Sequence, residues 1–119
     1  MTKVLIVEDN PMNMELMLVM LKTNGFEAYS AFDGKEAIEN MEKENFDIIL
    51  MDIELPGING VEVARTIKEK YKNIPIIAVT SFAMRGDKER FIASGFDDYV
   101  SKPVDISSFL IKLNKYKKN

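Results

Sequence analysis

The chain contains the stretch Phe46-Asp47-Ile48-Ile49-Leu50-Met51-Asp52, in which consecutive apolar residues lead directly into an acid. An apolar run without in-out alternation is typical of a strand in a parallel sheet, because helices cover both faces of such a sheet. The turn-forming segment Leu55-Pro56-Gly57-Ile58-Asn59-Gly60 follows closely. The stretch therefore predicts a buried strand that carries a carboxylate, Asp52, at its carboxyl end.

Other apolar runs on both sides of this stretch also end in polar residues. They are Val4-Leu5-Ile6-Val7 before Glu8-Asp9, Ile76-Ile77-Ala78-Val79 before Thr80, and Tyr99-Val100-Ser101 before Lys102-Pro103. Four predicted strands thus each present a potentially reactive group at the carboxyl end.

Amphipathic segments separate the apolar runs, which is the pattern of β-α units wound around a parallel sheet. We predict strands near residues 3–8, 27–31, 47–52, 75–79 and 98–101. The expected fold is α/β: a five-stranded parallel sheet doubly wound by five helices, with the order 2-1-3-4-5 that flavodoxin-like proteins of this kind have.

Residues typical of helix ends mark the intervening segments. Asn10 is a predicted N-cap with Pro11 at the first helical position, and Gly25 is a predicted stop. Two pairs have the spacing of a capping box: Asp33 with Glu36, and Asn59 with Glu62.

The last two helices differ in their expected anchoring. In the last helix an apolar stripe is formed by Ile106, Phe109, Leu110 and Leu113. The fourth helix carries Gly86 within a charged run and has few apolar anchors, so we expect low stability there.

Length and composition restrict the possible functions. The 119 residues suit one domain, residues 1–119, with a single core. The net charge of -3 does not favour nucleic-acid binding, and the lysines near the carboxyl end are explained by a solvated helix end. There is no cysteine, and no apolar stretch approaches the about 20 residues of a membrane span. We expect a cytoplasmic protein with no membrane partner.

In this strand order, the strands that end in Glu8-Asp9 and Asp52 flank the point where strand order reverses, and ligands bind at such points. Three converging carboxylates repel one another unless a cation neutralises them, and oxygen ligands of this kind suit Mg²⁺. Thr80 and Lys102 would then supply a hydroxyl and a positive charge to an anion transferred onto Asp52. An aspartyl-phosphate is the expected product.

These residues are similar to those of a known family. The segments Leu5-Ile6-Val7-Glu8-Asp9-Asn10, Leu50-Met51-Asp52-Ile53-Glu54-Leu55-Pro56-Gly57, Ala78-Val79-Thr80-Ser81 and Tyr99-Val100-Ser101-Lys102-Pro103 occur with the separations of a receiver domain. The whole chain resembles a CheY-like response-regulator receiver domain of two-component signalling. The stretch from Ser81 to Asp87 is closest to receivers of the single-domain cell-cycle class and of hybrid kinases.

The resemblance implies a role for each matching position. Asp52 would be the phosphoacceptor; Glu8 and Asp9 would be the acidic Mg²⁺ pair, with the backbone carbonyl of Glu54 as a further ligand. Thr80 and Lys102 would bind phosphoryl oxygens, and Thr80 with Tyr99 would form the switch. The peptide bond before Pro103 would be cis. In the family, the positions of Glu54 and Phe82 also influence the lifetime of the phosphoryl group.

The resemblance also implies partners. The chain has no histidine, so the phosphohistidine donor would be another protein, a sensor histidine kinase or a histidine phosphotransfer protein. This partner would dock near Met12, Asn13 and Leu16. The fourth helix, fifth strand and fifth helix would form the output face for a downstream protein. The chain would act as a phosphoacceptor switch and not as an enzyme, in a stand-alone or relay role.

Two other classes share some of these features. A haloacid-dehalogenase-like phosphatase would use Asp52-Ile53-Glu54 as an Asp-x-Asp nucleophile pair with magnesium, but that family places its nucleophile after the first strand and usually has a longer chain. A flavodoxin-like FMN carrier shares the winding, but Glu8 and Asp9 would repel the FMN phosphate.

Overall fold

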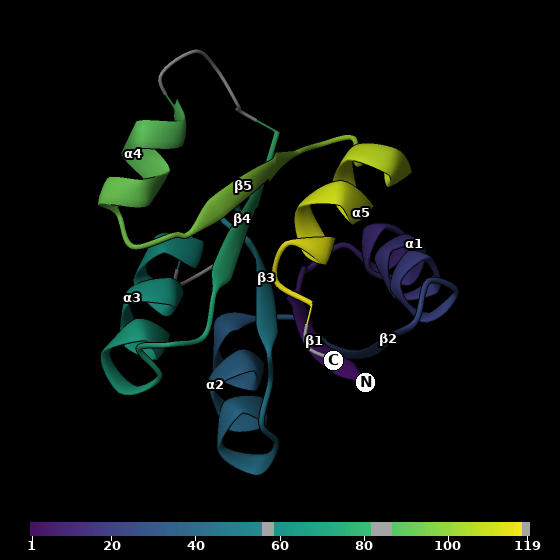
Figure 1. Ribbon diagram of the computed structural model, residues 1–119. Helices are drawn as coiled ribbons and strands as arrows, with labels where there is room; N and C mark the ends of the chain where they lie inside the picture. Colours follow the sequence, from purple (N-terminus) through teal and green to yellow (C-terminus); the bar gives the residue numbers. More distant parts are fainter. Residues whose placement is uncertain (56–58, 82–86, 118–119) are drawn as a thin grey trace.

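The computed structural model describes residues 1–55, 59–81 and 87–117, in which strands and helices alternate along the chain (Figure 1). The elements are β1 (Thr2–Val7), α1 (Pro11–Lys22), β2 (Phe26–Ala31), α2 (Gly34–Lys43), β3 (Ile48–Asp52), α3 (Gly60–Lys70), β4 (Ile76–Thr80), α4 (Asp87–Ala93), β5 (Asp98–Ser101) and α5 (Ile106–Asn114). The predicted residues Pro56, Gly57, Ile58, Phe82 and Gly86 lie outside the described ranges.

The sheet is parallel and has the strand order β2-β1-β3-β4-β5, which confirms the predicted topology. Val7 pairs with Met51, Met51 pairs with Ala78, and Thr80 pairs with Ser101. This register brings the carboxyl ends of β1, β3, β4 and β5 to one edge of the sheet.

Helices cover both faces of the sheet (Figure 1): α1 and α5 lie on one face, and α2, α3 and α4 lie on the other. Successive side chains of a strand point to opposite faces. Accordingly, Val4 and Ile6 pack with α1 and α5, whereas Leu5 and Val7 pack with the other three helices. Both halves of the core are apolar, which explains why β1 and β3 read as continuous hydrophobic runs.

The predicted helix starts are confirmed. The Asn10 side chain accepts hydrogen bonds from the N–H groups of Met12 and Asn13. Asp33 caps α2 and Asn59 caps α3, each accepting from the backbone N–H of the glutamate three residues on. In an ideal capping box the Glu36 carboxylate would accept from the N–H of Asp33. It accepts instead from the N–H of Phe32, one residue before the cap. Gly25 has φ of +87°, which favours glycine after the end of α1.

The prediction for the apolar stripe of α5 is wrong at one end. Phe109 and Leu113 are fully buried and Leu110 is partly buried, but Ile106 is 45% exposed. Ile106 is the first residue of the helix. The helix is held against the sheet by its later turns, so helical periodicity alone overestimated the length of the buried stripe.

The fourth helix is short. α4 has seven residues, and Phe91 anchors it to the core by packing against Phe96 and Tyr99, with ring centroids 6.1 and 5.6 Å away. Within the described ranges, no helix combines the length and the apolar composition that crossing a membrane requires.

Candidate functional site

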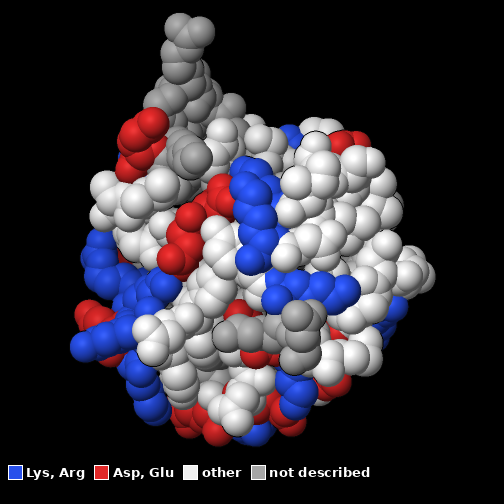
Figure 2. Space-filling view, viewed as in Figure 1, with Lys and Arg blue, Asp and Glu red and all other residues white. Residues whose placement is uncertain are grey.

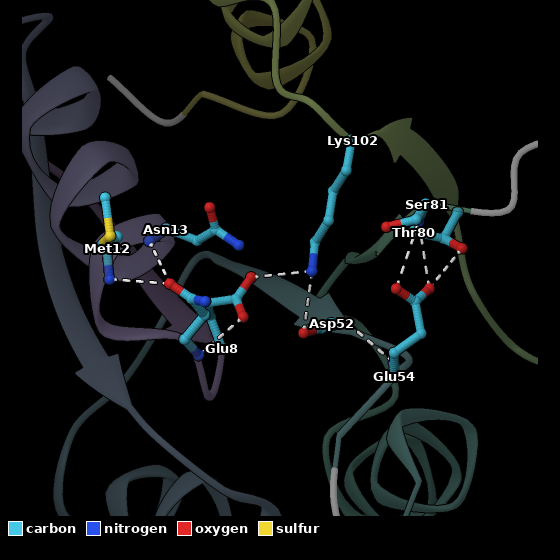
Figure 3. A network of polar contacts seen from close by, with 9 residues as sticks. Glu8, Met12, Asn13, Asp52, Glu54, Thr80, Ser81 and Lys102 are labelled. Carbon is cyan, nitrogen blue, oxygen red and sulfur yellow. Dashed lines mark hydrogen bonds and ion pairs between the residues drawn. The ribbon is translucent and has the colours of Figure 1, made fainter.

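The predicted site residues meet at the carboxyl edge of the sheet (Figure 3). Glu8 follows β1, Asp52 ends β3, Thr80 ends β4, and Lys102 follows β5. One carboxylate oxygen from each of Glu8, Asp9 and Asp52 lies within 4.8 Å of the others. Glu8 and Asp52 are each 1% exposed, whereas Asp9 is exposed to solvent. The fold thus brings the three acids together, with one of them open to solvent.

Lys102 lies between the two buried acids. Its Nζ donates a hydrogen bond to Oδ2 of Asp52 at 3.1 Å and lies 3.1 Å from Oε1 of Glu8. Burial would lower the pKa of Lys102, but the hydrogen bond to Asp52 and the close negative charges of Asp52 and Glu8 outweigh burial and raise it above its ordinary value. Lys102 is therefore a permanent positive charge at this edge of the sheet.

Glu8 is held less completely. Its Oε2 accepts from the N–H of Asn10 at 3.1 Å. Its Oε1 is buried without a hydrogen bond, although Nζ of Lys102 lies within ion-pair distance of it. The pKa of Glu8 is raised to about 7. Burial is the largest cause, and the negative charge of Asp52 contributes in the same direction. The predicted repulsion between the acids is therefore present, but it is secondary to desolvation.

These residues fit a hard divalent cation. Mg²⁺ prefers carboxylate, carbonyl and water oxygens and is usually held by one or two carboxylates directly. The cluster offers three carboxylates. The buried Oε1 of Glu8 accepts no hydrogen bond, so its lone pairs are available to a cation. The N–H of Glu54 donates to Oδ1 of Asp52 at 2.8 Å, so the predicted carbonyl ligand belongs to a residue held directly against Asp52.

The side chain of Glu54 makes contacts that the sequence did not predict (Figure 3). Its Oε2 accepts from Oγ1 of Thr80 at 2.8 Å, and its Oε1 and Oε2 lie 3.4 and 3.2 Å from the N–H of Ser81. The sequence had suggested a carbonyl ligand and an influence on phosphoryl lifetime at Glu54, but not a contact of its side chain with Thr80. The available signal was an acid two residues after Asp52, just beyond the end of β3, the strand that neighbours β4.

Tyr99 is held on the side of the sheet that packs with α2, α3 and α4. Its ring contacts Phe91, and Nζ of Lys112 lies 4.3 Å from the ring centroid. Lys112 also donates to the backbone carbonyl of Tyr99 and, at 3.2 Å, to Asp98. Lys112 therefore connects α5 to β5 at the predicted switch position.

A cavity of about 450 Å³ opens beside the acids, between α1 and the start of α5. It is lined by Glu8, Asn13, Leu16, Met17, Ser81, Lys102, Pro103 and Val104. The Lys102–Pro103 peptide is cis, as the family resemblance implies. The cavity therefore reaches Glu8 and Lys102 from the side of α1.

The combination is suited to phosphoryl transfer. A carboxylate nucleophile, a cluster of cation ligands, a fixed lysine charge and a hydroxyl group are brought to one edge of the sheet. Phosphoryl transfer is catalysed mainly by positioning and by neutralising the charge on the phosphoryl oxygens, and this arrangement can do both.

Comparison with known proteins agrees with this chemistry. The model of the response regulator receiver domain family matches residues 4–114. The polar-differentiation response regulator DivK of Brucella ovis is 42% identical over 119 residues, covering 98% of this chain and 97% of that protein. This similarity confirms the expected likeness to receivers of the cell-cycle class.

Solved structures lead to the same family. The receiver domain of the sensor histidine kinase PA1611 from Pseudomonas aeruginosa, with a magnesium ion coordinated in its active site cleft, has a TM-score of 0.87 and 33% identity, covering 97% of this chain and 96% of that one. The response regulator TrrA of Thermotoga maritima, in complex with Mg²⁺ and BeF, has a TM-score of 0.88 and 33% identity, covering 98% of this chain and 100% of that one. These similarities favour a receiver over a haloacid-dehalogenase-like phosphatase. The chain belongs to the response regulator receiver domain family.

Proposed function

We propose that this chain is a phosphorelay receiver that accepts a phosphoryl group from a partner phosphohistidine onto Asp52. The observation that carries the proposal is the buried Asp52 carboxylate, held by Lys102 and grouped with Glu8 and Asp9. An Asp52 oxygen would form the new P–O bond as the donor P–N bond breaks, and the bonding electrons would return to the donor imidazole.

Glu8, Asp9 and Asp52, with the backbone carbonyl of Glu54, would hold Mg²⁺. Bound there, the ion would neutralise negative charge on the phosphoryl group during transfer. Support comes from the three clustered carboxylates and from the magnesium in the PA1611 and TrrA structures.

Lys102 and Thr80 would bind oxygens of the transferred phosphoryl group. Lys102 already touches Asp52, and its charge would pair with the product as it now pairs with the carboxylate. Thr80 is buried at the end of β4 and would donate its hydroxyl proton. Movement of Thr80 toward the phosphoryl group, followed by Tyr99, would transmit the change to the face formed by α4, β5 and α5.

The phosphodonor would dock on α1, near Met12, Asn13 and Leu16. Met12 is 80% exposed and Leu16 is 49% exposed, and a shallow groove of about 310 Å³ runs along Met12, Glu15, Leu16 and Val19. Figure 2 shows that the surface over α1 and α5 is largely uncharged. A sensor histidine kinase or a histidine phosphotransfer protein with an apolar helical surface would suit this face.

The remaining features of the proposal concern the whole chain. Residues 1–119 would form one receiver domain that works in the cytoplasm without direct contact with nucleic acid or membrane. It would act as a switch that is phosphorylated and slowly loses the phosphoryl group, and it would not turn over external substrates. A downstream protein would recognise the face formed by α4, β5 and α5.

Acetyl phosphate tests the proposal without a partner. Wild-type protein incubated with acetyl phosphate and Mg²⁺ should gain one phosphoryl group by intact-mass spectrometry. The Asp52→Asn variant, and wild-type protein in EDTA, should gain none, because the first lacks the nucleophile and the second lacks the cation. Absence of the adduct in folded wild-type protein, beside a receiver that is phosphorylated under the same conditions, would contradict the proposal.

A further inference from the structure

The carboxylate of Glu54 accepts two donors at the end of β4. The Thr80 hydroxyl donates to it at 2.8 Å, and the N–H of Ser81 lies 3.2 Å from the same oxygen. Thr80 is fully buried and Glu54 is partly buried, so these bonds are only partly exposed to competing water. Hydrogen bonds to a charged acceptor are stronger than neutral ones, which makes this contact a substantial local interaction.

The position of Glu54 ties these donors to Asp52. The backbone N–H of Glu54 donates to Oδ1 of Asp52, while its side chain reaches across to β4 (Figure 3). On the opposite side Lys102 holds Oδ2 of Asp52. A phosphoryl group on Asp52, held by Lys102, would have to use the donors of Thr80 and Ser81, which the Glu54 carboxylate now occupies.

We infer that the Glu54 carboxylate is an internal substitute for the phosphoryl group: it holds the donors of Thr80 and Ser81 until phosphorylation displaces it. This inference rests on the proposed phosphoacceptor function. A carboxylate and a phosphoryl group both present anionic oxygens, so they compete for the same hydroxyl and N–H. Every phosphorylated state must therefore break the Glu54 contacts, which lowers the affinity of the site for phosphoryl groups.

The competition depends on the reach of the side chain as well as on its charge. In Glu54→Asp the charge remains but the side chain is one methylene shorter and cannot span to β4. In Glu54→Gln the length remains, and a neutral amide oxygen replaces the carboxylate as acceptor. The two variants thus separate direct competition for the donors from general repulsion between Glu54 and the phosphoryl group.

Beryllofluoride, a phosphoryl analogue, measures the competition at equilibrium. Its affinity in the presence of Mg²⁺ should be followed by two-dimensional NMR of the wild-type protein, both variants and Glu69→Asp, a control at an exposed position on α3. We expect Glu54→Asp to bind about tenfold more tightly than the wild type, the equivalent of one lost hydrogen bond to a charged group. Glu54→Gln should show a smaller gain, and Glu69→Asp should match the wild type.

The Ser81 amide proton reports the contact without any ligand. Before beryllofluoride is added, its resonance should shift upfield in Glu54→Asp because the charged acceptor is lost, and it should not move in Glu69→Asp. Unchanged affinity together with an unchanged Ser81 resonance in Glu54→Asp would overturn the inference. Tighter binding by Glu54→Gln alone would also overturn it, since charge repulsion would then be the cause. Failure of the wild type itself to bind beryllofluoride, beside a receiver that binds it, would refute the phosphoacceptor function and the inference with it.

Discussion

At the residue scale, Lys102 determines how much negative charge the site retains. Its single positive charge contacts two buried carboxylates, those of Asp52 and Glu8. Moving two carboxylates out of water is costly, and one lysine cannot neutralise both. The excess negative charge, together with the incompletely bonded Glu8, is the physical reason why a divalent cation suits this site.

The titration of Glu8 should make stability depend on pH when no metal is present. Its pKa is about 7 in the folded chain, against an ordinary value of 4.5, so the folded state binds the proton more tightly than the unfolded state. The contribution of Glu8 protonation to the free energy of unfolding is fully present below pH 4.5 and is lost as the pH rises through 7. Glu8→Gln, which remains neutral, should therefore unfold at higher urea than the wild type above pH 7 in EDTA.

Urea denaturation across this pH range measures the effect, with the exposed Glu69→Gln as the matched control. The advantage of Glu8→Gln should shrink as the pH falls toward 4.5, where wild-type Glu8 is also protonated in the folded state. Parallel pH profiles for Glu8→Gln and the wild type would show that Glu8 ionises normally.

At the element scale, the start of α3 lies directly against the strand that carries Asp52. A Cβ atom added to Gly60 would come within 2.3 Å of the backbone oxygen of Asp52 and 2.6 Å of Cα of Ile53. Backbone atoms cannot move aside without shifting the strand end. The helix α3 therefore contributes to the geometry of the site without supplying a side chain to it.

Gly60→Ala should accordingly destabilise the fold and disturb the site. Overpacking of this kind costs about 1–3 kcal/mol, and the backbone contact places Gly60 at the upper end of that range. We expect a lower free energy of unfolding in urea and slower phosphorylation by acetyl phosphate. Gly34→Ala is the matched control: its added Cβ would meet a side-chain methyl of Val63 at 2.5 Å, away from the backbone of β3. Equal rates of phosphorylation in both variants would contradict a link between the start of α3 and the site.

At the scale of the whole molecule, the two layers of helices present different surfaces. The layer of α1 and α5 exposes several large apolar side chains, among them Met12, Leu16, Val19 and Ile111. The cavity beside Glu8 and Lys102 opens along α1, and Leu16 lines both this cavity and the groove of the proposed docking surface. The proposed docking surface therefore lies next to the site but is formed by residues other than the acids, Lys102 and Thr80.

Substitution of the α1 surface should separate these two functions. Met12→Ser with Leu16→Ser should slow phosphoryl transfer from a phosphorylated histidine phosphotransfer protein at least about tenfold, which corresponds to the loss of about 1.4 kcal/mol of binding. Phosphorylation by acetyl phosphate should not change, because neither residue is among the acids, Lys102 or Thr80. Ile92→Ser, at a 49% exposed position on α4 in the other layer of helices, is the control. An equal loss with both phosphodonors would contradict docking on α1.

The sequence contained enough to predict the strands, the caps and the residues that gather at the sheet edge. Apolar runs without alternation identify strands covered on both faces, and each run ends where its polar group is needed. Capping depends on residues within one turn, so Asn10, Asp33 and Asn59 were predicted correctly. The strand order was expected from other doubly wound proteins and not from the pattern, which predicts only that parallel strands joined by helices place their carboxyl ends on one edge.

Contacts between separate elements could not be read from these local patterns. Ile106 continues a helical stripe in sequence, but its exposure depends on where α5 leaves the sheet. The bond from Thr80 to the Glu54 side chain joins residues 26 positions apart, and the sharing of Lys102 between Glu8 and Asp52 requires three strand ends to meet. Side-chain reach across neighbouring strands depends on their register and spacing in three dimensions. For this reason the residues of the site could be predicted from the chain, whereas the partner of each charge emerged only when the strands were assembled.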